Sequence, residues 1–213
     1  GNVTLGDADD AEIAATDIST IAGDTSGTVT VTNNINLTGN SDVIATAVGN
    51  VNTFSGTPTA TLGDAHTLAE LKAINNKLSG TLTLNDYTVA LSGSSADVAA
   101  ALAGNFADTY SGTATLNDNH TLAELVAINN GTTGNITLNS NAVALTGSTS
   151  DVKAALAGNV GAAYTGNIVL NDADNTSIAA ADITTIESDT TGTITVSNNI
   201  RLTGNSDVIA AAV

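Results

Sequence analysis

Residues Leu5–Val48 read LGDADDAEIAATDISTIAGDTSGTVTVTNNINLTGNSDVIATAV, and this pattern returns without a gap at Leu170–Val213, where 31 of 44 positions are identical. A second pattern, Leu62–Gly104, returns at Leu116–Gly158 with 28 of 43 positions identical. The chain therefore consists of two related units in the order A, B, B, A. Internal similarity at a fixed spacing is the signature of a repeat architecture.

The two patterns predict one continuous repeat array over residues 1–213. Its parts are repeat A (1–56), repeat B (57–111), a second repeat B (112–165) and a truncated repeat A (166–213). The two A units lie 165 residues apart, which indicates a super-repeat that begins a second time near the end of the sequence.

A shorter period lies inside the repeats, because acidic residues recur every 27 positions. They are Glu70, Asp97, Glu124 and Asp151. Thr67-x-x-Glu70 and Thr121-x-x-Glu124 have the pattern of a capping box, in which the hydroxyl and the carboxylate each accept a hydrogen bond from a helix N-terminal amide. Leu71, Val98, Leu125 and Val152 follow at the same spacing. Each half-repeat is therefore predicted to carry a short helix with one apolar stripe.

Strand patterns lie between the expected helices. Thr28–Thr32, Thr81–Leu84 and Thr193–Val196 alternate Thr with Val, Leu or Ile, which places the apolar side chains on one face. A unit of about 27 residues cannot bury its own apolar face and must stack on its neighbours. The predicted fold is α/β, an elongated repeat solenoid with short parallel strands and short helices, with two half-repeats in each repeat of about 54 residues. The alternative is a discrete α/β domain with one parallel sheet.

Composition excludes several classes of function. The net charge is −17 with only four basic residues, so the chain cannot form the basic patch that nucleic acids require. Anionic membranes are disfavoured for the same reason, and no apolar run has transmembrane length, so no membrane insertion is expected. The absence of cysteine excludes disulfides and thiolate metal sites.

The acidic residues after the strands are the candidate metal ligands. A Leu-x-Asp pattern places Asp7 and Asp172 at equivalent positions, and the A repeats add Asp9 and Asp174. Clustered carboxylates suit calcium, which prefers hard oxygen ligands. The alternative role for these residues is in Asx turns and helix N-caps. We therefore predict Asp7, Asp9, Asp172 and Asp174 as candidate calcium ligands and expect no other cofactor.

Other polar and aromatic residues have structural interpretations. His66 and His120 each precede a capping Thr, which predicts exposed polar positions rather than a zinc site. Phe54, Tyr110 and Tyr164 each precede a hydroxyl residue and a glycine, and each ring is expected to fill the loop between repeats. Surface glycans remain a further candidate partner for these rings.

Threonine rows leave a second alternative open. Thr59/Thr61 and Thr81/Thr83 are examples of outward Thr-x-Thr pairs, which fit either ordinary strands or an ice-binding surface. Catalysis is not expected, because the chain has only two histidines and its acidic residues are duplicated with the helix caps. An active site is normally a single asymmetric cluster.

Several short segments of the sequence resemble repeats of a known group of proteins. TLAELKAINN (67–76), ALSGSSADVAAALAG (90–104) and AATDISTI (14–21) resemble repeats of very large cell-surface proteins of marine cyanobacteria and related bacteria. Such repeats often share a polypeptide with haemolysin-type calcium-binding repeats. The resemblance implies a secreted or surface-attached protein of adhesion, motility or extracellular fibres.

Together these features predict a non-enzymatic structural protein outside the cell or on its surface. It would form an extended spacer, an adhesin stalk or a filament, and the alternative is a solenoid module that binds calcium, glycan or ice. Neither end has the pattern of a capping repeat, since Val213 is the equivalent of Val48. The expected partners are therefore neighbouring repeats or copies of the chain itself, end to end.

Overall fold

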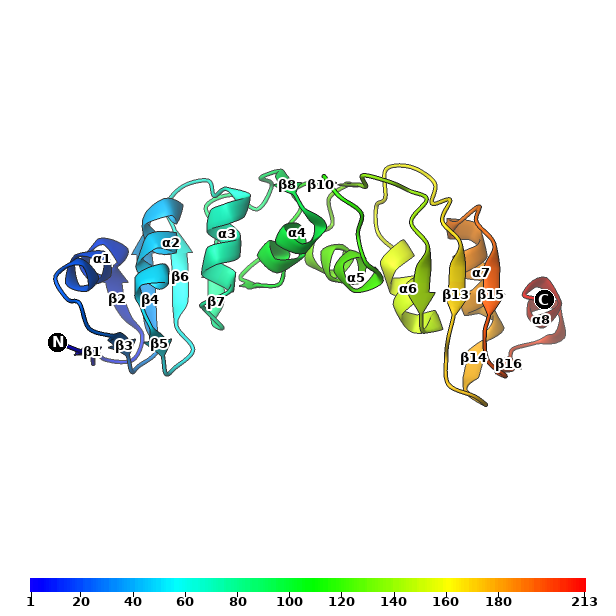
Figure 1. The fold of residues 1–213 in the computed structure, drawn as a ribbon, viewed down its shortest axis with the longest axis horizontal. Helices are drawn as coiled ribbons and strands as arrows, with labels where there is room; N and C mark the ends of the chain where they lie inside the picture. The colour runs from blue at the N-terminus through cyan, green and yellow to red at the C-terminus, as the bar shows by residue number, and fades with distance from the viewer. The chain divides into compact units, whose positions relative to one another are not determined.

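A computed structural model describes residues 1–213 and contains eight helices and sixteen short strands (Figure 1). Every strand pair with an assigned register is parallel, and the strands form several small sheets. The prediction of an α/β fold with short parallel strands and short helices is therefore confirmed. The contacts between Cα atoms divide the chain into two compact units: unit 1 is Gly1–Leu91 with Asp97–Gly112, and unit 2 is Ser92–Ala96 with Thr113–Val213.

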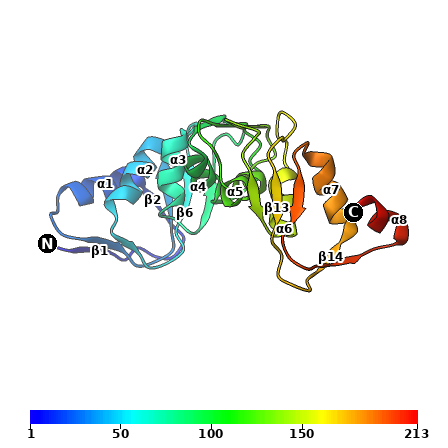
Figure 2. The ribbon, with the colours of Figure 1, turned by 45° about the vertical axis from the view of Figure 1, so that its right-hand side comes forward.

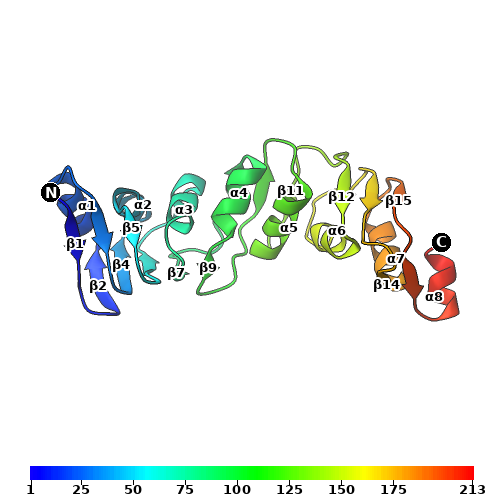
Figure 3. The same cartoon turned by 60° about the horizontal axis from the view of Figure 1, so that its bottom comes forward.

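Unit 1 holds two parallel sheets, with strand orders β1-β3-β5 and β2-β4-β6-β7-β9. Its elements are β1 (Val3–Leu5), β2 (Ala11–Ala14), α1 (Ala15–Gly23), β3 (Val29–Val31), β4 (Ile35–Gly39), α2 (Ser41–Asn50), β5 (Thr53–Phe54), β6 (Thr59–Leu62), α3 (Leu68–Asn75), β7 (Thr81–Thr83), most of α4 (Ser95–Leu102) and β9 (Asn105–Phe106). Helix α2 packs between α1 and α3. Figure 2 shows α1 and α2 on the side of the unit away from β1, and Figure 3 shows β2 beside β4.

Unit 2 holds sheets of order β11-β10-β8, β12-β13-β15 and β14-β16. Its elements are β8 (Leu91–Gly93, from Ser92 onward), β10 (Ala114–Leu116), α5 (Leu122–Gly131), β11 (Ile136–Thr137), β12 (Leu145–Gly147), α6 (Thr149–Leu156), β13 (Ile168–Leu170), β14 (Ser177–Ala179), α7 (Ala180–Asp189), β15 (Ile194–Val196), β16 (Arg201–Thr203) and α8 (Ser206–Ala211). Helices α5 to α8 pack in chain order.

The strand that opens a repeat has two partners of different kinds. In unit 1, one partner of β6 is β4 of the preceding repeat A, the strand before the second helix of that repeat. Its other partner is β7, which follows the first helix of the same repeat as β6. In unit 2, β13 lies in the same way between β12 and β15. Main-chain hydrogen bonds therefore join one repeat to the next.

The predicted periodicities place the core correctly. The four stripe residues spaced by 27 positions are all fully buried: Leu71, Val98, Leu125 and Val152 have 0% exposure. Strands β3 and β6 alternate as expected, with Val, Ala and Leu buried and Thr partly exposed on the other face.

Candidate functional site

Aspartates after the opening strands cap helices of the preceding half-repeat. Asp64 Oδ1 accepts a hydrogen bond from the Ser41 N–H at 2.7 Å, at the start of α2. Asp118 Oδ1 accepts from the Ser95 N–H at the same distance. These carboxylates satisfy free amides at the positive end of a helix dipole. The predicted capping role therefore applies, but each aspartate caps a helix 23 residues earlier rather than the helix that follows it.

The predicted capping boxes also join neighbouring half-repeats. In α3, Thr67 and Glu70 exchange both hydrogen bonds of the box. The same Glu70 Oε2 accepts the Ser41 hydroxyl at 2.9 Å. Burial opposes ionisation of Glu70, but the hydrogen bonds from Thr67 and Ser41 outweigh it and lower the pKa of the carboxyl group.

Repeat B supplies a second copy of this network. Thr121 and Glu124 form the box of α5, and Glu124 Oε2 accepts the Ser95 hydroxyl at 2.9 Å. The pKa of Glu124 is also lowered: burial opposes ionisation, and the hydrogen bonds from Thr121 and Ser95 outweigh it. An identical arrangement 54 residues apart indicates a structural role for both carboxylates.

Asparagines secure the opposite ends of the second helices. Asn75 Nδ2 donates to the carbonyl of Ala101 in the last turn of α4, and Asn129 Nδ2 donates to carbonyls of the last turn of α6. A Cβ atom at Gly104 would lie 2.2 Å from Asn75 Oδ1, so the close approach requires glycine there. These asparagines were not predicted as helix caps, although the sequence Ile-Asn-Asn recurs at 74–76 and 128–130.

The two histidines are buried, so the prediction that they are exposed is wrong. His66 and His120 are each only 3% exposed. Each lies against a tyrosine 44 residues later, with Nε2 2.9 Å from the Tyr110 hydroxyl and 3.1 Å from the Tyr164 hydroxyl. The tyrosine rings, at 2% exposure, leave no room for a solvated imidazole.

The hydrogen bonds of the tyrosine hydroxyls indicate which ring nitrogen of each histidine carries the proton. The Tyr110 hydroxyl donates to the carbonyl of Val89 at 2.7 Å, so it accepts from the His66 Nε2–H. The Nδ1 atoms of both histidines are buried without a partner. Burial lowers the pKa of both imidazoles, against the raising effect of nearby carboxylates, and raises the pKa of Tyr164 to about 12. Each imidazole therefore favours its neutral form. The rings of Tyr110 and Tyr164 are buried, whereas Phe54 is only partly buried.

The candidate calcium ligands lie in two loops. Asp9 Oδ1 accepts from the Asn34 N–H at 2.9 Å, and Asp174 Oδ1 accepts from the Asn199 N–H at 3.0 Å. Asp172 caps α6 by accepting the backbone N–H and the hydroxyl of Thr149. The carbonyl oxygen of Asp7 accepts from the Asn33 side chain, and its carboxylate is exposed.

The carboxylates of these loops have partners within the protein. Three of the four carboxylates already accept hydrogen bonds from the protein, as expected for turns and caps. No group of three or more His, Cys, Asp or Glu side chains is arranged to hold a metal ion. Calcium ligation would therefore require main-chain oxygens of the same loops.

Threonines on neighbouring strands lie in register. In unit 1, Thr30 lies opposite both Thr4 and Thr53. On the other sheet, Thr61 lies opposite Thr38 and Thr83. The predicted outward rows therefore form short hydroxyl ladders across three strands.

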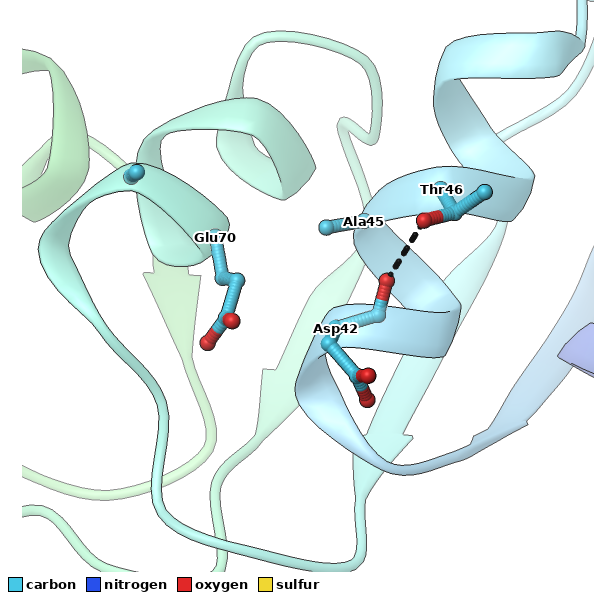
Figure 4. Close-up of a pocket in the computed structure, with 5 residues that line it drawn as sticks. Asp42, Ala45, Thr46 and Glu70 are labelled. Atoms are coloured by element: carbon cyan, nitrogen blue, oxygen red, sulfur yellow. Dashed lines mark hydrogen bonds between the residues drawn. The ribbon is translucent and has the colours of Figure 1, made fainter.

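One surface hollow lies between α2 and α3 (Figure 4). It has a volume of about 360 Å³ and is lined by Asp42, Ala45, Thr46, Ala69 and Glu70. The Thr46 hydroxyl donates within its own helix to the Asp42 carbonyl at 2.9 Å. The Glu70 carboxylate at its edge accepts hydrogen bonds from the Ser41 hydroxyl and the Thr67 N–H, so it belongs to the capping network described above.

Comparisons with known proteins add no relative. No family model matches the chain, and no curated protein matches it. None of the helices is both long enough and apolar enough to cross a lipid bilayer.

Proposed function

We propose that this chain is a non-enzymatic structural repeat protein, an elongated solenoid that acts as an extracellular or cell-surface spacer, adhesin stalk or filament. One observation carries the proposal: the Asp, Glu, Asn and His side chains that could do chemistry recur in equivalent hydrogen bonds between successive half-repeats. Ser41–Asp64 is matched by Ser95–Asp118, and His66–Tyr110 is matched by His120–Tyr164.

The duplication supports a mechanical role. Catalysis needs one set of functional groups that converge on a substrate, whereas a spacer needs the same interface between each pair of successive half-repeats. Here the interface between half-repeats combines parallel strand pairing, a helix cap from the next half-repeat and a buried apolar stripe. The net charge of −17 keeps such a surface soluble and discourages lateral aggregation.

Small-angle X-ray scattering tests the proposal on the chain and on a longer version in which residues 1–165 are repeated once more. We expect the maximum dimension to grow in proportion to the added super-repeat while the cross-sectional radius stays constant. A compact body would instead have a radius of gyration that grows only as about the 0.38 power of length. Scaling of that kind would contradict the solenoid and the spacer role together.

The alternative is a ligand-binding module, which the ladders Thr4–Thr30–Thr53 and Thr38–Thr61–Thr83 favour. Regularly spaced hydroxyls could order water or bind sugar. Melting temperatures measured with calcium and with magnesium at equal ionic strength discriminate the calcium form of this alternative. A large rise with calcium alone supports ligand binding, and equal responses support the spacer.

A further inference from the structure

At two interfaces between successive helices, a lysine of one helix pairs with an aspartate of the next. Lys72, the fifth residue of α3, forms an ion pair with Asp97, the third residue of α4. Lys153, the fifth residue of α6, forms the same kind of pair with Asp182, the third residue of α7. At both interfaces, the fifth position of one helix therefore faces the third position of the next.

Between α5 and α6 the same two positions hold an acid without a lysine. Val126 is the fifth residue of α5, and Asp151 is the third residue of α6. They follow Lys72 and Asp97 by 54 residues, the spacing of the two B repeats. Repeat B therefore occurs in two versions, one with an ammonium group of the chain itself at this interface and one without it.

A hollow lies at this interface in the second repeat B. It has a volume of about 270 Å³ and is lined by Leu122, Ala123, Val126 and Asp151. Leu122 and Val126 are partly buried and pack against the core of unit 2. The hollow is smaller than the pockets of about 300–1,000 Å³ that hold drug-sized ligands, so it suits a single unbranched chain.

The Asp151 carboxylate can accept a further hydrogen bond. Its Oδ2 accepts the Ser148 hydroxyl at 2.8 Å, and its Oδ1 accepts no hydrogen bond within the chain. The two ion pairs of the protein do not include Asp151. The net charge of −17 adds a long-range attraction for cations. The hollow therefore combines apolar walls with one available carboxylate oxygen.

We propose that the hollow between α5 and α6 binds an aliphatic ammonium group, either a lysine side chain of a partner or a free alkyl diamine. The methylene chain lies against Leu122 and Val126, and the ammonium group donates to Asp151 Oδ1. Lys72 provides the internal precedent, because its ammonium group donates to Asp97 at the equivalent place. An alkylammonium ion fits better than a bare metal ion, because its methylene chain can use the apolar walls.

The hollow between α2 and α3 is the other candidate for such a ligand. Its fifth and third positions are Ala45 and Glu70, which Figure 4 shows on the two helices that border it. Glu70 already accepts hydrogen bonds from Ser41 and Thr67, and Ala45 offers only a methyl group. This hollow provides less apolar contact for a methylene chain, so we expect the site at Asp151 to bind more tightly.

NMR titration of the isotope-labelled chain with two probes tests the site. The probes are 1,5-diaminopentane, which is a free diamine, and Nα-acetyl-lysine methylamide, which presents a lysine side chain. We expect saturable shifts of the Val126 and Asp151 amide signals with a dissociation constant of about 1 mM, as for one exposed ion pair and a short buried methylene chain. Tighter binding of the diamine would identify a free diamine as the ligand, and tighter binding of the amide would identify a lysine side chain.

An exchange of residues between the two B repeats supplies matched variants. Val126→Lys places an ammonium group of the chain beside Asp151, so the probe shifts there should be lost. Lys72→Val removes the ammonium group beside Asp97, so new saturable shifts should appear at Asp97. Melting curves show whether each variant is folded, and the gain of binding in Lys72→Val does not depend on a loss of structure.

Charge variants separate the site from general attraction to an acidic protein. Asp151→Asn should weaken binding about fivefold, the contribution of one exposed ion pair. Glu187→Gln removes the same charge from an exposed position on α7 and should leave binding unchanged. Equal effects of these two changes would overturn the inference. The absence of shifts at Asp151 in the natural chain and at Asp97 in Lys72→Val would overturn it too, and would leave the scattering test of the spacer role unaffected.

Discussion

His66 and His120 each place an imidazole inside the protein with one nitrogen on a tyrosine hydroxyl and the other without a partner. A proton added to Nδ1 would bring a charge and an unsatisfied donor into an apolar interior. The carboxylates of Asp64, Glu70 and Asp86 raise the pKa of His66 but do not offset its burial. At the residue scale, these two sites should make the contacts between the half-repeats of each repeat B sensitive to acid.

Stability should therefore fall as pH decreases below about 6.5, the pKa of an unfolded histidine. The folded-state pKa values are lowered, so the unfolded chain binds more protons and the stabilisation present above pH 6.5 is lost. The slope can reach about 1.4 kcal/mol per pH unit for each histidine. Urea unfolding between pH 8 and 5 measures it, and the double variant His66→Gln, His120→Gln should flatten the curve in this window. An equal slope in that variant would contradict the assignment.

Gly104 offers a test of close packing. Gly104→Ala places a Cβ atom 2.2 Å from Asn75 Oδ1, at the contact that secures the C-terminus of α4. We expect a loss of about 1–3 kcal/mol in the free energy of unfolding, the cost of overpacking. Gly49→Ala in α2 is the control, because no atom lies within 4 Å of its Cβ, and it should be neutral or slightly stabilising.

At the scale of elements, the short helices depend on partners from neighbouring half-repeats. Helices of six to ten residues are too short to be stable alone. Helix α2 has no side-chain cap from its own Asn40, and its first amide is satisfied by Asp64 from the next repeat. Helix formation and the stacking of half-repeats are therefore coupled.

Asp64→Ala should expose this coupling. Loss of the cap is expected to cost about 1 kcal/mol of stability and to increase hydrogen exchange in the first turn of α2. Asp7→Ala changes the equivalent residue of the first repeat, whose carboxylate caps no helix within the chain, and should leave monomer stability unchanged. Equal destabilisation by both changes would show that the helix cap is not the cause.

At the scale of the whole molecule, charge opposes folding. The chain has twenty-one acidic residues and only four basic ones, and the two ion pairs, Lys72–Asp97 and Lys153–Asp182, are partly exposed to solvent. Exposed pairs contribute at most about 1 kcal/mol each. The acidic surface is therefore largely uncompensated and repels itself in the compact state.

Added salt should therefore stabilise the protein. We expect the melting temperature to rise between about 0.05 and 0.5 M sodium chloride, over which the screening length shortens to a few ångströms. Potassium chloride should give the same rise at equal ionic strength, because the effect is screening and not site binding. A melting temperature that falls with salt, or responds to one cation only, would contradict this explanation.

The sequence alone determined the order of repeats, the α/β class, the capping boxes at Thr67 and Thr121 and the buried stripe that includes Leu71. These features are local: a box spans four residues and a stripe repeats with the helix turn, so neighbouring residues are enough to specify them.

Only the tertiary structure decided which partner each polar side chain meets. Asp64 caps Ser41 rather than its own helix, His66 lies against Tyr110, and β6 joins strands of two repeats. These partners lie 22 to 44 residues apart. A repeating sequence fits several such pairings equally well, and the choice among them depends on how successive half-repeats stack and exclude water from His66 and Tyr110.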